Sequence, residues 1–533
     1  MITMFEGNSV APIAPRSSVG ERENRRMMKY CYTLSTADGE IIYNCLTGHT
    51  VLLPDGDVQA FMQTDYAVNH SFSVPLDFKE DPQWFGCAAE TDPETVQEMI
   101  RSLYAAYKRE VAIDEKRRKL YTKENTDRWL QAFGSPLYVF RKDDFTEAYR
   151  HLEAIFQKEY PKYRVAYSYK TNYVPKICKA VQQLGGYAEV VSEFELNIAR
   201  SLGYRDSEII YNGPCKGDSI ETFLLNHGIL NIDSFDELEA VCNVADRHPE
   251  AEISFGIRLN LMISQDWPSR FGIDADEESM DAILCEVSRR SNLRIAGLHF
   301  HSGELTLESW RTRAGHMLEV IDKYFPVGLT YIDLGSGMRV RGFYDKSLPK
   351  TEDIRSLERY AATALRPFAA YYQDRAMEEK PLLFTEPGTI LIKDCVDFLS
   401  TVQTVKQNQG KTYIIADASK AQLGSESYID RRPLMVIDTS LKKKRVENAA
   451  IVGYTCMESD QLYVGFSGQI GKGDRLVFGD VGAYSLVEKP PFIRPGCAMI
   501  EIDGQREMLI KEAESDEDLL RTYVFDETGG RND

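Results

Sequence analysis

The sequence predicts an α/β fold: a (β/α)8 barrel followed by a C-terminal β domain, with a small α+β accessory domain at the N-terminus. Three observations predict it. Apolar runs alternate with helix-like segments from residue 164 to residue 388, which is typical of a parallel sheet buried on both faces. Short strand-like runs and turn residues dominate from about residue 395 onward. Hairpin-like runs begin at Tyr30, well before the alternation starts.

The N-terminal region divides into two parts. Residues 1–28 carry Pro, Ser, Gly and charge without periodicity, so we expect them to be disordered. The runs "YCYTLST", "EIIYNCL" and "HTVLL" then read as short strands joined by turn residues, and residues 95–112 have helical periodicity. Residues 30–120 are therefore predicted to form the accessory α+β domain.

The barrel is predicted over residues 133–393. A count of eight apolar runs favours closure of the sheet into a barrel, although an open doubly wound sheet stays an alternative at this point. Segments such as "PKICKAVQQLG" and "SFDELEAVCNVA" have the periodicity of the connecting helices. The predicted strands are 164–170, 187–192, 208–213, 230–234, 253–260, 295–301, 330–335 and 382–388.

The C-terminal third has a different pattern. Runs such as "TYIIADAS", "RPLMVI" and "CAMIEI" are short and separated by turns, which predicts a β domain over residues 394–512. An acidic tail is expected over residues 513–533.

Composition excludes several classes of partner. The chain has 63 basic and 82 acidic residues, a net charge of −19, which disfavours nucleic acid or an anionic membrane surface as the main partner. No apolar stretch is long enough to span a bilayer, and the N-terminus lacks a hydrophobic signal core. The ten cysteines are scattered without a CxxC pair, so we predict no metal site and a reducing, cytoplasmic setting.

Polar residues follow the strands of the predicted barrel at their carboxyl ends, where loops from different strands converge and active sites of this architecture lie. Each of these residues alone is a common surface feature, but their occurrence at successive strand ends indicates an active site. Because strand side chains alternate, at most one of the two histidines is expected to face the barrel mouth. The strand-end residues are Lys170, Glu189, His299, His301, the "GSG" of residues 335–337, and Glu386.

From about residue 133 to residue 500 the chain resembles the fold type III (alanine racemase-like barrel) amino-acid decarboxylases that depend on pyridoxal 5′-phosphate (PLP), the group of diaminopimelate and ornithine decarboxylases. The motifs that carry this resemblance occur in the family's order. They are "YSYKTN", "YAEVVSEFEL", "IDSFDEL", "SRFGI", "GLHFHSG", "DLGSG", "EPG", "RRPL", "CMESD" and "GAYS".

The resemblance implies that Lys170 binds PLP covalently through its amine. Desolvation at the end of an apolar strand is expected to lower the pKa of that amine and so favour the reactive, unprotonated form. Gly335, Ser336 and Gly337 would hold the cofactor phosphate, because glycines let backbone N–H groups approach an anion closely.

Three further cofactor contacts are implied by the resemblance. Glu386 matches the carboxylate that keeps the pyridine nitrogen protonated, so that the ring can act as an electron sink. His301 matches the imidazole that stacks on the ring, while His299 is expected to be structural. Tyr484 matches a tyrosine near the phosphate.

The motif "GYTCMESD" implies a proton donor from a second subunit. Cys456 matches the family's catalytic cysteine, which acts across a dimer interface and protonates the carbanion after CO2 leaves. Asp460 belongs to the same motif, and the expected substrate contacts are Thr389, Arg432, Glu458 and Asp460. The resemblance therefore implies a homodimer with its active sites at the interface, acting as a lyase that converts an amino acid into a primary amine and CO2.

Departures from the family pattern affect the predicted substrate. Thr389 follows "EPG" where the family usually has Arg, and Met457 follows the cysteine where an acidic residue is usual, with Glu458 one position later. Arg432 matches an arginine that meets a substrate carboxylate in diaminopimelate decarboxylases. The predicted substrate is a diaminopimelate-like, basic, or modified or carrier-linked amino acid, and the accessory domain is a candidate for binding a peptide or carrier partner.

Two alternatives stay open at this point. The first is a PLP-dependent racemase on the same barrel. Such enzymes use a second base, often tyrosine, in place of the cysteine, so "CMESD" argues against it. The second is a non-catalytic regulatory homologue, against which the presence of both Lys170 and Cys456 argues.

Overall fold

The computed structural model describes the backbone of residues 31–36, 39–44 and 50–53, and describes residues 112–261, 269–339, 356–424, 433–488 and 491–524 in full. Two compact units divide the chain. One comprises residues 1–119, 306–308 and 339–359, and the other comprises residues 120–305, 309–338 and 360–533. The disorder expected for residues 1–28 and the helix expected over residues 95–112 lie outside the described residues, and the domain boundaries stay predictions.

The first unit contains a three-stranded antiparallel sheet in the order β1-β2-β3. Its strands are β1 (Cys31–Thr36), β2 (Gly39–Asn44) and β3 (Thr50–Leu53). They fall on the three runs that the sequence pattern singled out, so the predicted hairpin strands are confirmed.

The second unit contains a closed parallel barrel. Neighbouring strands pair in parallel around the ring in the order β5-β6-β7-β8-β9-β11-β12-β13, and β13 returns to β5. The pairing of β8 with β9 completes the ring, so the barrel is confirmed and the open sheet is wrong. The strands are β5 (Tyr163–Ser168), β6 (Tyr187–Val190), β7 (Ile209–Tyr211), β8 (Ile229–Ile232), β9 (Ile253–Asn260), β11 (Leu293–His299), β12 (Tyr331–Asp333) and β13 (Leu382–Thr385). A two-residue strand, β10 (Ile273–Asp274), adds to the edge of β9.

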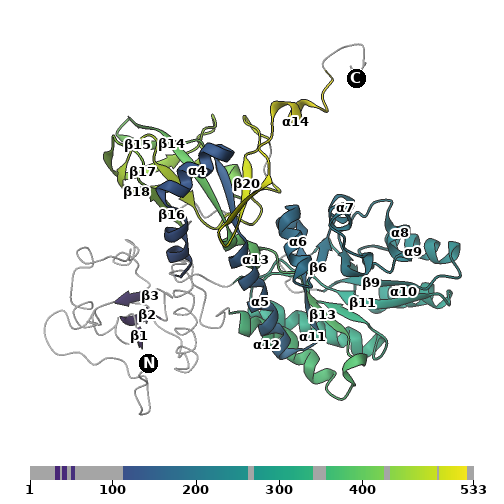
Figure 1. Ribbon diagram of the computed structural model, residues 1–533. Helices are drawn as coiled ribbons and strands as arrows, with labels where there is room; N and C mark the ends of the chain where they lie inside the picture. The colour runs from purple at the N-terminus through teal and green to yellow at the C-terminus, as the bar shows by residue number, and fades with distance from the viewer. Residues whose placement is uncertain are drawn as a thin grey trace, which may run out of the picture. The chain divides into compact units, whose positions relative to one another are not determined.

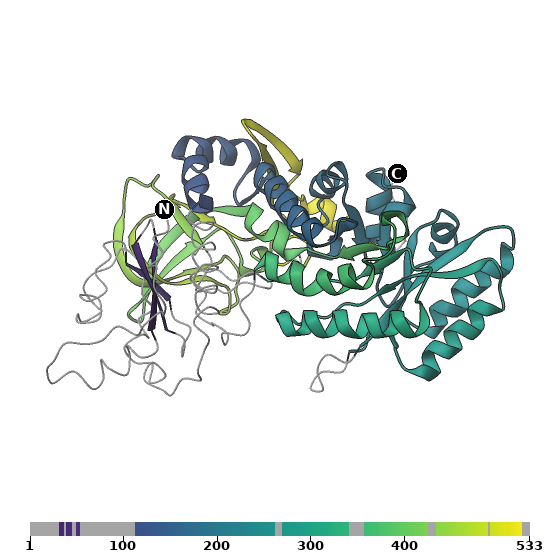
Figure 2. The same ribbon diagram turned by 90° about the horizontal axis from the view of Figure 1, so that it is seen from below.

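Helices surround the barrel strands (Figures 1 and 2). Side-chain oxygens cap several of them: Ser192 accepts the N–H of Glu195, and Ser234 accepts the N–H of Glu237. Such caps fix where each strand-to-helix loop ends. The barrel helices are α5 (Lys142–Glu159), α6 (Pro175–Gln183), α7 (Glu193–Ser201), α8 (Ile220–Leu225), α9 (Phe235–Arg247), α10 (Glu277–Ser288), α11 (Leu307–Tyr324), α12 (Leu357–Tyr371) and the short α13 (Thr389–Ile392).

One large aromatic side chain fills the interior of the barrel. Tyr331 of β12 packs in a cluster with side chains from β5, β7, β11 and β13. Two neighbouring strand positions are glycines for a steric reason, because a Cβ atom at Gly256 or Gly297 would collide with the Tyr331 side chain. The Tyr331 hydroxyl donates a hydrogen bond of 2.7 Å to Asn231 Oδ1, which connects the barrel interior to the polar groups above it.

The C-terminal sheet follows the barrel, as predicted. Its main path runs β18-β17-β15-β14-β4-β20-β21, and β19 pairs with both β14 and β16. The strands after the barrel are β14 (Val396–Asn408), β15 (Lys411–Ala416), β16 (Leu434–Ile437), β17 (Lys444–Val452), β18 (Gln461–Ile470), β19 (Arg475–Phe478), β20 (Ala498–Asp503) and β21 (Arg506–Lys511).

The start of the predicted barrel range belongs to this sheet instead. Strand β4 (Leu137–Arg141) pairs antiparallel with β14 and parallel with β20, so the barrel strands begin only at β5. Helix α4 (Lys123–Phe133) brings Trp129 into the same apolar core, where Leu137, Leu399 and Ile500 are also buried. The sequence pattern grouped residues 133–142 with the barrel because they are adjacent to it in the chain, whereas their apolar partners lie in the C-terminal strands.

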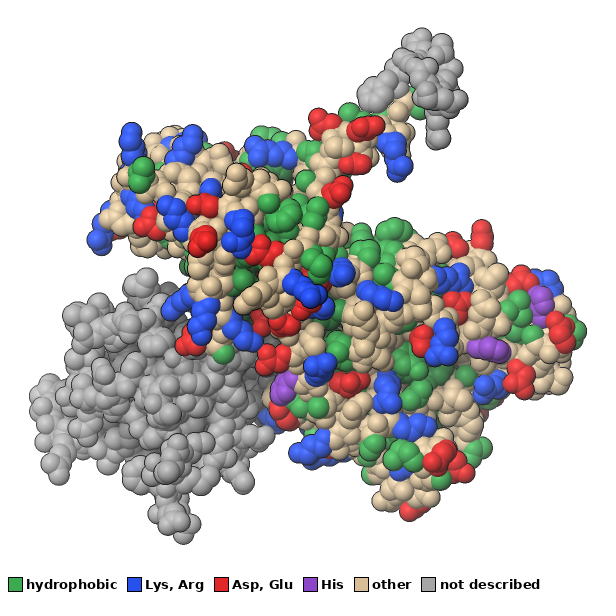
Figure 3. Space-filling model, in the orientation of Figure 1, with side chains coloured by type: hydrophobic (Ala, Val, Ile, Leu, Met, Phe, Trp, Pro, Cys, Tyr) green, Lys and Arg blue, Asp and Glu red, His purple; other side chains and the backbone are tan. Residues whose placement is uncertain are grey.

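Charges of both signs are interspersed over the face drawn in Figure 3. Among the described residues, no helix combines the length and the apolar character needed to cross a membrane. Within the predicted acidic tail the chain forms the short helix α14 (Asp516–Leu520).

Candidate active site

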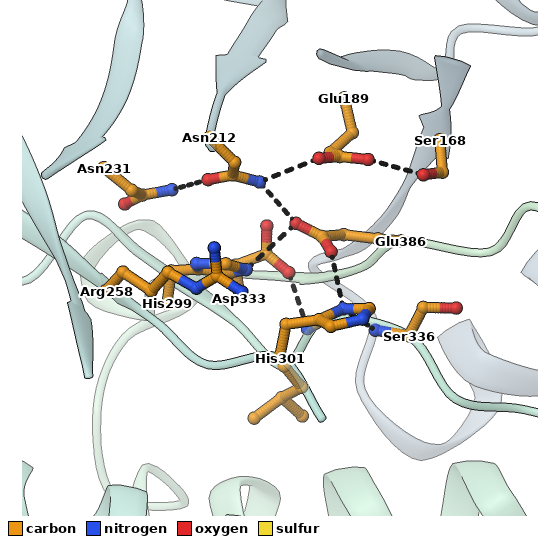
Figure 4. Close-up of polar contacts among 12 residues, drawn as sticks. Ser168, Glu189, Asn212, Asn231, Arg258, His299, His301, Asp333, Ser336 and Glu386 are labelled. Carbon is orange, nitrogen blue, oxygen red and sulfur yellow. Dashed lines mark hydrogen bonds and ion pairs between the residues drawn. The ribbon is translucent and has the colours of Figure 1, made fainter. Parts of the chain in front are cut away.

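A polar cluster lies where the barrel strands end, and Figure 4 shows its side chains converging. The predicted residues Lys170, Glu189, His301 and Glu386 are all part of it. Each of them lies at or near the carboxyl end of a different barrel strand: β5, β6, β11 and β13. The structure therefore brings the strand-end residues together, as the barrel architecture predicts.

Lys170 lies in a single 3-10 turn, Tyr169–Thr171, directly after β5. Its Nζ donates a hydrogen bond of 2.9 Å to Glu189 Oε2, and its side chain is 34% exposed. Burial alone would lower the pKa of Lys170, but the charges of Glu189 and Glu386 and the hydrogen bond to Glu189 raise it above its ordinary value. The expectation of a lowered pKa is therefore wrong, because the sequence pattern gave the desolvation of the strand end but not the carboxylates beside it.

Glu386 is a fully enclosed carboxylate with two imidazole neighbours. Its Oε1 lies 3.1 Å from His299 Nε2, and its Oε2 lies 3.2 Å from His301 Nδ1. Burial alone would raise the pKa of Glu386, but the two imidazoles and Lys170 hold it well below its usual range. Burial lowers the pKa of both histidines, so both are neutral near pH 7 and Glu386 stays ionised.

The two histidines meet the same carboxylate, which corrects the expectation that at most one faces the barrel mouth. Strand β11 ends at His299, and His301 lies in the irregular segment after it. The two histidines are two positions apart, and side chains at such positions lie on the same face of an extended chain, so alternation itself lets both reach Glu386.

Two buried asparagines are site residues that the sequence reasoning missed. Asn212, just after β7, donates one hydrogen bond of 3.2 Å to Glu189 Oε1 and another of 2.6 Å to Glu386 Oε1. Asn231 of β8 donates to Asn212 Oδ1 at 2.8 Å and accepts from Tyr331, which fixes the orientation of both amides (Figure 4). The sequence indicates these two site residues by an asparagine within each of the apolar runs "EIIYNG" and "LNIDS".

Two further buried polar residues of the barrel mouth also escaped the sequence reasoning. Ser168 donates a hydrogen bond of 2.5 Å to Glu189 Oε2, which adds a second donor beside Lys170. Arg258 of β9 forms an ion pair of 3.0 Å with Asp233, and both are nearly inaccessible to solvent.

The glycine loop follows β12. Gly335 and Gly337 have φ values of +66° and +103°, where side chains are disfavoured, and a Cβ atom at Gly337 would come within 2.8 Å of two backbone oxygens. The N–H of Ser336 donates to His301 Nδ1 at 3.1 Å, so the loop lies against the histidine. Asp333 accepts the N–H of Gly335 at 2.9 Å.

Asp333 is the second carboxyl group of this cluster. Burial and the neighbouring charge of Glu386 raise the pKa of Asp333 well above its ordinary value. Asp333 therefore keeps its proton at pH values at which Glu386 is already ionised. Ligand atoms of His299, Asp333 and Glu386 lie within 4.8 Å of one another, a spacing that would also admit a metal ion.

These residues fit PLP. The cofactor needs an amine for its aldehyde, an ionised carboxylate for its pyridinium nitrogen, and backbone N–H groups that a phosphate can approach. Lys170 would supply the first, and the buried, ionised Glu386 would supply the second. Gly335 and Gly337 keep the loop free of side chains, which suits the third.

Tyr484 lies next to the segment that carries Lys170. Its backbone N–H donates to Thr171 O at 3.0 Å, and the amide of Asn172 donates to Gly482 O at 2.9 Å. Tyr484 is half-buried and has a φ value of +55°. The "GAYS" loop of the C-terminal domain is thereby joined to the barrel mouth.

The "CMESD" segment divides into an enclosed and an exposed part. The Asp460 carboxylate is buried and accepts hydrogen bonds from Ser419, Lys420 and Thr455, which holds two loops together. The carboxylate is thus hydrogen-bonded within its own chain, and its expected substrate contact stays a prediction. Cys456 and Glu458 are exposed.

The remaining two predicted substrate residues are Thr389 and Arg432. Thr389 is half-buried and begins α13 directly after Gly388, close in sequence to Glu386. Arg432 lies outside the described residues.

Comparison with known proteins identifies a family for the barrel. Residues 147–393 match the model "Pyridoxal-dependent decarboxylase, pyridoxal binding domain". The diaminopimelate decarboxylase of Aquifex aeolicus is 25% identical over 403 residues, covering 72% of this chain and 90% of the relative. That of Methanocaldococcus jannaschii is 27% identical over 420 residues, covering 73% and 91%.

Solved structures share the fold. The crystal structure of diaminopimelate decarboxylase from M. jannaschii has a TM-score of 0.66 at 23% identity and covers 75% of this chain and 94% of that chain. Lysine decarboxylase from Selenomonas ruminantium has a TM-score of 0.56 at 20% identity, covering 72% and 97%.

Proposed function

The chain belongs to the pyridoxal-dependent decarboxylase family, and we propose that Lys170 and Cys456 are the residues through which it decarboxylates an amino acid. The enzyme is a PLP-dependent lyase that releases CO2 and a primary amine, and the racemase alternative is disfavoured. The observation that carries the residue assignment is the network Lys170–Glu189–Asn212–Glu386, which connects an amine to a buried, ionised carboxylate beside a glycine loop.

Each residue of the network has a definable task. PLP, when bound, supplies the electron sink for the bond that breaks. Glu386 is held ionised and enclosed, so it keeps a proton on a ring nitrogen placed beside it. Glu189 holds the Lys170 amine by ion pairing and is the nearest base for its proton. The two neutral imidazoles pack against Glu386 without adding charge of their own.

The proton balance requires a donor. Loss of CO2 from an amino acid leaves an electron pair on Cα, and one proton must be added there to give the amine. We assign this proton to the Cys456 thiol of a second subunit. The assignment is supported by the motif "CMESD" and by the exposure of residues 456–459, which form part of the surface of a single chain. A homodimer with shared active sites is accordingly part of the proposal.

The proposed substrate is a diamino acid of the diaminopimelate type. The names of the relatives support this choice, and one of the similar solved structures is a complex of diaminopimelate decarboxylase with L-lysine. Thr389 and Met457 replace residue types that the family uses near the substrate, so a different side-chain terminus is expected to be preferred. A cytoplasmic setting is also proposed, supported by the seven free thiols of the described residues.

The test is release of CO2 from a panel of D- and L-diamino acids, each offered free and as an Nε-acylated derivative, to purified enzyme loaded with PLP. We expect CO2 in stoichiometric amounts with amine from at least one member. Inversion at Cα without CO2 would contradict decarboxylation and favour the racemase. Release from the acylated derivatives alone would place the substrate in the modified or carrier-linked class.

A further inference from the structure

Helix α11 places a buried cation directly behind the glycine loop. The side chain of Arg313 is completely buried. Its Nη1 donates hydrogen bonds to two carbonyl oxygens of the loop, Leu334 O at 3.0 Å and Ser336 O at 2.7 Å. Its Nη2 donates to Ser309 Oγ at 3.2 Å, on the preceding turn of the same helix.

Trp310, one helical turn before Arg313, holds the same loop. Its Nε1–H donates to Gly337 O at 3.1 Å, and the Arg313 guanidinium lies 4.2 Å from the centre of the indole ring. Positions three apart lie on one face of a helix, so the two side chains act together on the loop. Three loop carbonyls, those of Leu334, Ser336 and Gly337, therefore point toward α11.

The hydrogen bonds from Trp310 and Arg313 also determine which N–H groups of the loop point away from α11. In a trans peptide the C=O and the following N–H point in opposite directions. The Ser336 carbonyl points to Arg313, so the N–H of Gly337 points away from α11. The Gly337 carbonyl points to Trp310, so the N–H of Met338 also points away from α11. The loop thus turns the N–H groups of Gly337 and Met338 to one side and the carbonyls of Ser336 and Gly337, which would repel an anion, to the other.

The charge of Arg313 has no carboxylate partner among the described residues. Burial lowers its pKa to about 9, yet the group is still protonated at pH 7. The charges of Glu304 and Glu386 act on the guanidinium only from beyond ion-pair distance, and its direct contacts are hydrogen-bond acceptors and aromatic rings, so its burial is costly. An anion held on the donor side of the loop would offset that cost.

We infer that Arg313 is a positioning residue for the phosphate group of the cofactor, which it favours through its charge and through its hold on the loop of residues 335–337. The inference rests on the proposed function. It implies that the affinity gained from Arg313 depends on the phosphate: the residue should matter for PLP and hardly at all for pyridoxal, which has the same ring and aldehyde.

The experiment compares binding of PLP and of pyridoxal to the apoenzyme by absorbance titration, with competition by inorganic phosphate as a third measurement. Arg313→Met removes both the charge and the hydrogen bonds, whereas Arg313→Lys keeps the charge. Lys323→Gln is the matched control, since Lys323 is an exposed cation on the same helix, 3.4 Å from Glu277. Circular dichroism of each apoenzyme checks that the fold is retained.

We expect Arg313→Met to weaken PLP binding about tenfold or more and to change pyridoxal binding by less than about threefold, with Arg313→Lys recovering part of the loss. Equal weakening of both ligands, or no weakening, would overturn the inference and leave the proposed function intact. If Arg313→Met does not fold, Arg313→Gln, which keeps hydrogen-bond donors but lacks the charge, takes its place, and unchanged discrimination between the two ligands in that variant would overturn the inference equally. Failure of the wild-type apoenzyme to bind PLP would instead refute the proposed function, and this inference with it.

Discussion

At the scale of single residues, the two carboxyl groups near the glycine loop have opposite charge states. Glu386 is ionised because Lys170 and two imidazoles surround it, whereas Asp333 is protonated because burial and Glu386 act on it. Divergent pKa values of neighbouring acids commonly accompany acid–base function. Here they support the proposed contact between Glu386 and the ring nitrogen.

Replacement of Glu386 tests that assignment. Glu386→Gln keeps the size and the hydrogen bond from Asn212 but cannot hold a proton on a ring nitrogen. We expect kcat for CO2 release to fall about 10²- to 10³-fold while PLP stays bound. Glu378→Gln, a substitution of an exposed glutamate, is the control. An unchanged kcat in Glu386→Gln would refute the role.

A second residue-scale prediction concerns stability and pH. Glu195 is buried in α7, and burial raises its pKa to about 7. A carboxyl whose pKa is higher in the folded state stabilises the fold below the unfolded pKa and loses that contribution as pH rises. In Glu195→Gln the amide oxygen can still accept the Val191 N–H that the wild-type carboxylate accepts at 2.7 Å.

We therefore expect the free energy of unfolding of wild type, relative to Glu195→Gln, to fall by about 1–3 kcal/mol between pH 4.5 and pH 7.5. Urea unfolding of both proteins across this range measures it. A pH-independent difference between the two proteins would contradict the raised pKa.

The sequence could predict some site residues and not others for a physical reason. Lys170, His301 and Glu386 occur in motifs with distinctive neighbours, and their strand ends were readable from apolar runs. Asn212 and Asn231 were not predicted, because a single amide within an apolar run carries no information about what it contacts. The raised pKa of Lys170 was equally hidden, since it depends on carboxylates delivered by other strands.

At the scale of elements, the segment before the barrel completes the C-terminal sheet. Strand β4 lies between β14 and β20, and Trp129 of α4 is buried in the core beside it. The barrel strands were predictable because each is an apolar run with a helix on either side. The membership of β4 was not, because sheet pairing between distant segments is decided by tertiary packing rather than by local pattern.

Truncation of Trp129 tests this arrangement. Trp129→Ala leaves a large cavity in the sheet core, so we expect the free energy of unfolding to fall by about 3–5 kcal/mol. Leu441→Ala, at a fully exposed position of the same domain, should change it by less than about 0.5 kcal/mol. Chemical denaturation of the three proteins measures the difference. Equal stabilities would show that α4 does not support the sheet.

At the scale of the whole molecule, the proposal places parts of one active site on two chains. Lys170 and the glycine loop belong to one barrel, and Cys456 is assigned to the partner. If so, Lys170→Ala and Cys456→Ala are each inactive as homodimers, but a mixed dimer contains one intact site.

Mixing the two variants after dissociation should restore about a quarter of wild-type activity, because half of the randomly formed dimers are mixed and each has one working site of two. CO2 release before and after mixing is the measurement. No recovery, with mixed dimers verified by mass, would place both residues in the same chain's site.

Borohydride reduction of the PLP-loaded enzyme tests whether Lys170 is the residue that holds the cofactor. Reduction fixes the pyridoxyl group to whichever amine carries it, and mass spectrometry of the digested protein locates it. Lys216 provides a discriminating rival, since it is another enclosed lysine near the barrel mouth, paired with Glu237 at 2.7 Å. We predict the label on Lys170 and its loss in Lys170→Ala; a label on Lys216, or on no lysine, would contradict the account.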